Sequence, residues 1–211
     1  MNFDPIKVSN PVAAIDVTDG PASLNAFARP ECAASIWRRQ TPEDIQDWLD
    51  RLDPERLPRG RVILRPDEVA DTFGQLCDIA QTPPGPERDW LRNDVAALAG
   101  MFADLMSARF LRLRLDVVTT NSCRKFHIDA ITARLICTYR GTGTQYGISA
   151  NREDPSDILT VPTGAPILLR GTLWPETPSA GLLHRSPPIE GKGETRLILF
   201  LDPVFDPEDE V

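Results

Sequence analysis

Histidine is scarce in this chain: the 211 residues contain two, His127 and His184. Any metal site built from three histidines is therefore excluded. The four cysteines, at positions 32, 77, 123 and 137, form no Cys-x-x-Cys pair. Their spacing argues against a structural zinc knuckle. Without a secretory signal, we expect all four thiols to stay reduced.

Long hydrophobic runs and signal sequences are also missing. No stretch approaches the roughly 20 apolar residues of a membrane helix, and the N-terminus lacks a basic segment followed by an apolar core. Lysine and arginine number 23 against 31 aspartates and glutamates, for a net charge of −8. This acidic balance argues against nucleic acid or an anionic membrane as a partner. Because the sequence shows neither a signal segment nor a membrane helix, we expect a cytoplasmic protein.

Helical patterns dominate the first part of the chain, residues 1–109. The first forty residues have no clear period, and we expect them to form an irregular arm with short elements. A Thr-Pro-Glu-Asp start then opens a helix within 41–54. Apolar residues then recur at helical spacing over 66–80 and again over 87–109. We expect these N-terminal helices to pack on the rest of the protein.

The pattern changes after Arg109, where leucines alternate with charged residues from 111 to 117 and predict a half-buried strand. More short candidate strands follow, bounded by turn residues and with no long helix between them. This run favours an antiparallel sandwich, jelly roll or barrel. The further candidate strands are 124–129, 133–139, 144–149, 157–161, 165–172, 181–184 and 195–201. We thus predict an α+β protein with a β-rich core over 110–204 and an acidic tail over 205–211.

The segment His127-Ile128-Asp129 carries the strongest chemical signal. On a strand, residues 127 and 129 point to the same side, so an imidazole and a carboxylate can meet one point. His184, at the end of an apolar strand, can complete a set of two histidines and one carboxylate, the facial triad of non-haem iron oxygenases. A zinc site that adds Cys123 is the alternative, although a regular strand places Cys123 roughly 13 Å away.

Arg196 opens the apolar strand 196–201 and needs an anionic partner there. A planar guanidinium grips a carboxylate through two hydrogen bonds, and a dicarboxylate such as 2-oxoglutarate would supply one.

Taken in order, these residues resemble the Fe(II)/2-oxoglutarate-dependent dioxygenases, whose signature is His-x-Asp, a distal His and then an Arg. Their fold is a double-stranded β-helix, a jelly roll of the cupin-like kind. The prolyl-hydroxylase and phytanoyl-hydroxylase branches look closest. The strand 134–139 is similar to the one after His-x-Asp, and the segment 162–169 is similar to the turn and strand before the distal His. His184, Gly193 and Arg196 resemble the end of the signature.

A narrower resemblance covers most of residues 110–202. The segments CRKFHID, RLICTYRGTGT and LLHRSPP look like an uncharacterised bacterial family, the domain-of-unknown-function family eighteen-twenty-six. The family is associated with gene neighbourhoods of zinc limitation and metal-handling GTPases. This context implies a metal-handling protein as a partner.

The resemblance implies roles for individual residues. His127, Asp129 and His184 would bind Fe(II), and Arg196 would bind the far carboxylate of 2-oxoglutarate. The residues implied to assist at the cosubstrate are Ser186, Tyr139 and Arg134. The implied reaction couples oxidative decarboxylation of 2-oxoglutarate to hydroxylation of a small molecule or a protein side chain. A non-catalytic zinc- or iron-binding protein on the same scaffold remains the alternative, and an interaction module with structural histidines is the third.

Overall fold

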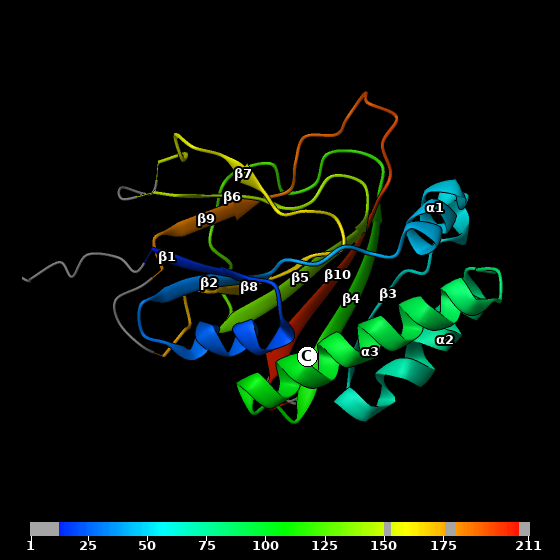
Figure 1. Ribbon diagram of the computed structural model, residues 1–211, viewed down its shortest axis with the longest axis horizontal. Coiled ribbons are helices and arrows are strands. Elements are labelled where there is room, and N and C mark those ends of the chain that lie inside the picture. The colour runs from blue at the N-terminus through cyan, green and yellow to red at the C-terminus, as the bar shows by residue number, and fades with distance from the viewer. Residues whose placement is uncertain (1–12, 150–152, 176–179, 207–211) are drawn as a thin grey trace, which may run out of the picture.

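A computed structural model describes residues 13–149, 153–175 and 180–206, and Figure 1 shows two sheets with helices against the larger one. The large sheet has seven strands, and the small sheet has three. In spatial order the large sheet contains β1 (Ala14–Thr18), β2 (Cys32–Trp37), β8 (Pro166–Arg170), β5 (Ala133–Arg140), β10 (Arg196–Val204), β4 (Phe110–Val118) and β3 (Gly60–Leu64). The small sheet contains β7 (Leu159–Thr160), β6 (Gln145–Ile148) and β9 (Leu182–Arg185). Neighbouring strands run antiparallel except β1 and β2, which run parallel.

Helices cover one face of the large sheet. They are α1 (Glu43–Arg51), α2 (Val69–Ile79) and α3 (Pro86–Met106), with short 3₁₀ helices η1 (Pro21–Ala28), η2 (Pro54–Arg56) and η3 (Pro66–Glu68). The apolar stripe of α3, which includes Leu98 and Phe102, belongs to the same buried cluster as Leu113 and Leu115 of β4. Burial of this stripe holds α3 on the sheet, because an amphipathic helix is stabilised mainly by packing its apolar face.

A second core lies between the large and small sheets. Ile136 of β5, Ile167 of β8 and Ile198 of β10 form one buried cluster with Tyr146 of β6 and Leu182 of β9. Odd-numbered positions of β4 enter the helix-side core, so their even-numbered neighbours point toward the second sheet. The result is a mixed structure dominated by sheets, in agreement with the predicted class.

Residues before 110 contribute strands as well as helices. The expected arm contains two short strands, β1 and β2, which form one edge of the large sheet. The segment Cys32–Trp37 is buried along almost its whole length, so it lacks the period of two that marks a half-buried strand. The other edge is β3, paired with β4.

The predicted strand 124–129 is also wrong. This segment is a loop whose only described pairing is a single bridge at His127. The predicted tail 205–211 lies mostly outside the described residues, since the description ends at residue 206.

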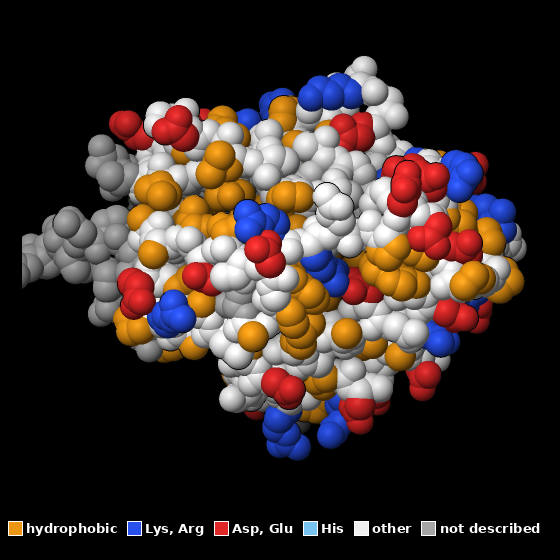
Figure 2. Space-filling model, in the orientation of Figure 1, with side chains coloured by type: hydrophobic (Ala, Val, Ile, Leu, Met, Phe, Trp, Pro, Cys, Tyr) orange, Lys and Arg blue, Asp and Glu red, His pale blue; other side chains and the backbone are white. Residues whose placement is uncertain are grey.

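The surface is charged with both signs. In the face shown by Figure 2, acidic and basic side chains are interspersed, and acidic side chains gather over α1. The exposed acidic residues of α1 are Glu43, Asp44, Asp47 and Asp50. No helix in the described part of the chain has the length and apolar character needed to cross a membrane.

Candidate metal centre

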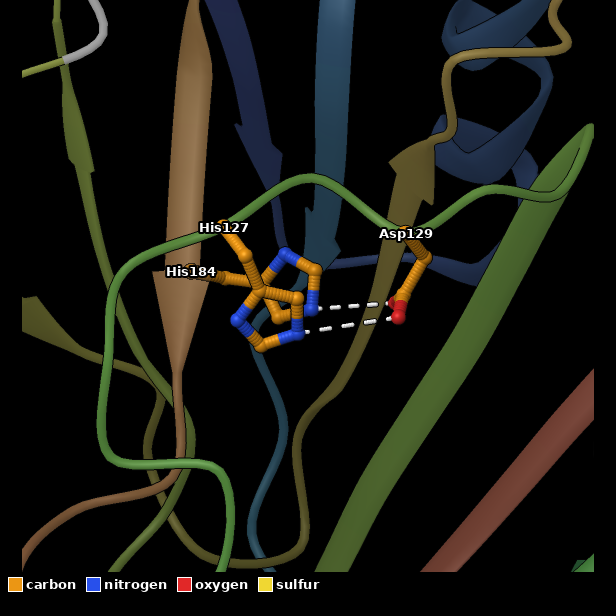
Figure 3. A group of neighbouring side chains, drawn as sticks. All are labelled: His127, Asp129 and His184. Carbon is orange, nitrogen blue, oxygen red and sulfur yellow. Dashed lines mark ion pairs between the residues drawn. The ribbon is translucent and has the colours of Figure 1, made fainter.

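The two histidines lie side by side although they are distant in sequence. His184 belongs to β9, and His127 lies in the loop between β4 and β5. Each backbone N–H donates to the carbonyl of the other residue at 3.0 Å. Figure 3 shows both rings and the Asp129 carboxylate turned toward one another. One ligand atom from each residue lies within 4.8 Å of the other two.

The loop that carries Asp129 is fixed by the segment after β8. The N–H of Thr172 donates to Asp129 O at 2.9 Å, and the N–H of Gly171 donates to Thr132 O at 3.0 Å. A Cβ atom on residue 171 would come within 1.9 Å of Ile131 O, so only glycine permits this approach. The backbone thus sets the position of Asp129 as well as that of both histidines.

Contacts inside the triad leave room for a shared cation. Asp129 Oδ2 lies 3.1 Å from His184 Nε2 and 2.8 Å from Arg134 Nη1, but neither contact has the alignment of a hydrogen bond. His127 Nδ1 lies 2.8 Å from Lys125 O, and its Nε2 lies 3.6 Å from Asp129 Oδ1. A proton on Nδ1 leaves the Nε2 lone pair of His127 free to bind a metal.

Burial and charge set protonation states suited to a metal. Burial lowers the pKa of His184 below the ordinary histidine value, although Asp129 partly opposes this effect. Burial would raise the pKa of Asp129, but its close contacts with both histidines and the charge of Arg134 hold it well below its usual range. The contact with the Asp129 carboxylate raises the pKa of His127, and burial partly opposes this effect. Asp129 is therefore anionic at neutral pH, and a metal must displace a proton from His127 more often than from His184.

A cavity of about 260 Å³ opens beside the triad. Its lining residues are Arg114, Ser122, Cys123, His127, Asp129, Arg134, Ile136, Thr144, His184, Arg185, Ser186 and Phe200. Ser186, expected near the cosubstrate, is among them. Cys123 also lines the cavity but lies outside the metal-ligating group found among the described residues. A larger depression of about 790 Å³ lies beside α1 and contains none of the candidate site residues.

Arg196 lies on the same face of β10 as Phe200, but it is not among the residues that line this cavity. Its side chain is buried; Nε donates to Thr142 O at 2.6 Å, and Nη2 lies 3.5 Å from Thr138 Oγ1. Nη1 has no hydrogen-bond partner. Burial lowers the pKa of Arg196 to about 10, with Glu194 acting in the opposite direction.

Two of the sequence-predicted residues have other contacts. Arg134 lies between two carboxylates. It forms an ion pair with Asp129, and its Nε and Nη2 donate to the carboxylate of Asp202 at 2.6 and 2.7 Å. Tyr139 lies on the opposite face of β5, fully buried in the helix-side core, and its hydroxyl donates to Asp94 Oδ2 at 2.6 Å. The expectation that Tyr139 assists at the cosubstrate is therefore wrong, because alternation along β5 turns it away from Arg134 and from the cavity.

Sequence reasoning missed Asp202 and Arg114. Asp202 reaches the triad through Arg134, and this contact depends on the register between β5 and β10. Arg114 was visible as a charged position in an alternating strand, but that pattern is also typical of a solvated face. No other signal in the sequence distinguishes Arg114 from the other charged residues of this strand.

Comparisons with known proteins bear on family and fold. The profile of a family described as "Protein of unknown function (DUF1826)" matches residues 18–202. No curated protein matches the chain in sequence. Among solved structures, dioxygenase for auxin oxidation 1 from Arabidopsis thaliana, in a binary complex with 2-oxoglutarate, aligns with a TM-score of 0.53 at 10% identity. That alignment covers 93% of this chain and 94% of the other.

The rice dioxygenase for auxin oxidation aligns with a TM-score of 0.51 at 12% identity, covering 93% of this chain and 84% of the rice protein. At such low identity the likeness shows the fold and nothing finer. The fold is similar to the jelly roll of the 2-oxoglutarate oxygenases.

Proposed function

The chain belongs to the DUF1826 family of unknown function, and we propose that it is an oxygenase that uses Fe(II) and 2-oxoglutarate to hydroxylate a substrate. The observation that carries the proposal is the convergence of His127, Asp129 and His184 beside a cavity. Two histidines and one carboxylate leave positions open on a bound iron, as oxygenase chemistry requires.

The residues present suit this metal. Asp129 Oδ2 makes two short contacts without hydrogen-bond alignment, so its lone pairs are available to a cation. Imidazole and carboxylate are both ordinary ligands of Fe(II). The triad has three ligating groups, whereas a structural zinc site uses four protein ligands. The donor set therefore favours iron in an open site over closed zinc coordination.

A dicarboxylate cosubstrate suits Arg196. A buried guanidinium with an unpartnered Nη1 is costly, and among the described residues no carboxylate lies within ion-pair distance of it. The far carboxylate of 2-oxoglutarate would pair with Nη1, with the hydroxyl of Thr138 beside it. Ser186, in the cavity lining, remains a proposed contact for the same molecule.

Other side chains would prepare the site. When bound, iron and 2-oxoglutarate supply the activation of molecular oxygen. Arg134, held by Asp202, keeps the Asp129 carboxylate ionised and oriented. The side chains of Ile136 and Phe200 in the cavity wall exclude water from the reacting groups.

Anaerobic titration of metal-free protein with Fe(II), with and without 2-oxoglutarate, tests this proposal. A weak metal-to-ligand absorbance band near about 500 nm is expected when the cosubstrate chelates iron held by a facial triad. The band should vanish in His184→Ala and weaken strongly in Arg196→Gln. Arg92→Gln, on the opposite side of the sheet, is the matched control for the loss of one positive charge and should retain the band.

The contrary result is equally specific. Tight Zn(II) binding that depends on His127, with no band under any condition, would refute the oxygenase. It would instead support a metal-binding or metal-handling protein that uses the same three ligands.

A further inference from the structure

Positive charge is concentrated around the candidate metal centre. Three arginines line the cavity, Arg114, Arg134 and Arg185, against a single carboxylate, Asp129. The whole chain has a net charge of −8, so the positive charge of this cavity lining is opposite in sign to that of the protein as a whole. Arg134 is accounted for by its ion pairs with Asp129 and Asp202. The other two arginines have no such role in the triad.

Arg114 is held in the cavity wall. Its guanidinium carbon lies 4.1 Å from the centre of the Phe200 ring, a cation–π distance that keeps the planar group against the wall. Its Nε is buried and makes no hydrogen bond. The carboxylate of Asp116 lies 3.3 Å from that Nε, but both side chains are about one-third exposed (32% and 36%). An ion pair with that much exposure is weak, so most of the capacity of Arg114 for hydrogen bonding is left for another anion.

A second arginine lies beside Arg114 on the neighbouring strand. Arg61 of β3 is directly opposite Arg114 in the β3–β4 register, and facing residues of an antiparallel pair point to the same side of the sheet. Like charges at such a pair of positions destabilise the sheet. Asp116 offsets part of this repulsion, and an anion bound at Arg114 would reduce it further.

Arg185 of β9 is the arginine that the small sheet contributes to the cavity lining. Its guanidinium carbon lies 4.4 Å from the centre of the Phe126 ring, and its Nε donates to Gln145 Oε1 at 2.8 Å. Neither contact neutralises its charge. Aromatic rings thus fix two guanidinium groups in the cavity lining, one from each sheet, without pairing them to a buried acid.

We propose that the substrate of this site carries an oxyanion group, a carboxylate or a phosphate, which Arg114 and Arg185 bind within the cavity. This inference rests on the proposed function, in which Arg196 binds the cosubstrate and leaves these two arginines for the substrate. A planar guanidinium binds either oxyanion through paired charge-assisted hydrogen bonds. A cavity of about 260 Å³ has room for a small anionic group rather than a large ligand.

Calorimetric titration with simple anions tests the assignment. Anaerobic protein containing Fe(II) and saturating 2-oxoglutarate is titrated with benzoate and with phenyl phosphate, which separate the two oxyanions. Benzyl alcohol is the neutral comparison. At least one anion should bind while the alcohol does not, and Arg114→Gln should weaken that binding about tenfold or more. Arg92→Gln makes the same charge change on α3, across the sheet, and should leave the affinity unchanged.

The cosubstrate band provides a separate readout. It should persist in Arg114→Gln, and Arg114→Lys should recover part of the anion affinity because it restores the charge without the planar group. Equal anion binding by wild type and Arg114→Gln would overturn the assignment. So would loss of the band in Arg114→Gln, since Arg114 would then bind the cosubstrate. If the band is absent from wild type, the proposed function is refuted instead. The comparison of anion affinity between wild type and Arg114→Gln then still tests whether Arg114 binds the anion.

Discussion

Replacing Tyr139 with phenylalanine separates a structural role from a role at the cosubstrate. The Tyr139 hydroxyl donates to Asp94 of α3 at 2.6 Å, and the same carboxylate accepts from Arg39 at 2.6 and 2.7 Å. These bonds join α3 to β5 within the helix-side core. Tyr139→Phe removes one of the three donors and keeps the ring, so it opens no cavity.

The size of the effect follows from the charge of the acceptor. A hydrogen bond to a charged group contributes about 1.5–3 kcal/mol. Asp94 keeps both bonds from Arg39, so we expect the lower end, about 1.5 kcal/mol. With a urea dependence of about 1–3 kcal/mol per molar for proteins, the unfolding midpoint should fall by about 0.5–1.5 M. The melting temperature should fall by roughly 3–6 °C for a chain of this size.

Urea unfolding followed by tryptophan fluorescence measures the change. Tyr146 is the only other tyrosine, and it is buried in the second core with no hydroxyl hydrogen bond among those described for it. Tyr146→Phe is therefore the matched control and should be nearly neutral. The iron and 2-oxoglutarate band should be unchanged in Tyr139→Phe. Wild-type stability in that variant, or loss of its band, would contradict the reasoning.

Three further predictions concern the metal centre. Asp202→Asn should weaken metal binding about tenfold, because Arg134 loses one of its two charged partners and orients Asp129 less firmly; competition with a chromogenic chelator measures this, and an unchanged affinity would count against the role of Asp202. Gly171→Ala should lose most metal binding in the same assay, since the new methyl group collides with Ile131 O; binding at wild-type strength would show that the loop tolerates the shift. In native protein at pH 8, a thiol reagent should label one cysteine quickly, the exposed Cys123, because burial raises the pKa of the other three thiols, one of them to about 12. Cys123→Ser should abolish the fast phase without weakening Zn(II) binding, and weaker binding would revive a four-ligand zinc site.

The sequence predicts the convergence of the triad because of two scarce residues. The chain has only two histidines, and both occur next to strand patterns, so few sets of histidine-containing ligands are possible. The predicted strand at 124–129 is wrong, yet His127 still meets His184 through a single bridge. Convergence in this case depends on one pair of backbone hydrogen bonds, and a regular strand is not needed.

Other features depend on information that a single sequence lacks. The strand β2 escapes detection because its burial on both faces removes the alternation that identifies half-buried strands. The pairing of Arg134 with Asp202 depends on the register between β5 and β10. The position of Tyr139 does follow from the sequence, because alternation along a strand places residues 134 and 139 on opposite faces.

The bridge between His127 and His184 also determines when the centre can exist during synthesis of the chain. His127 and Asp129 are synthesised before the later residues that hold their loop. Among these are Gly171, Thr172 and the strand of His184, which join the loop through backbone hydrogen bonds. A nascent chain that ends before β9 lacks His184 and the backbone bridge that holds His127. The complete set of three candidate ligands can therefore form only after β9 has been made, and a truncated product keeps the His-x-Asp motif without the third ligand.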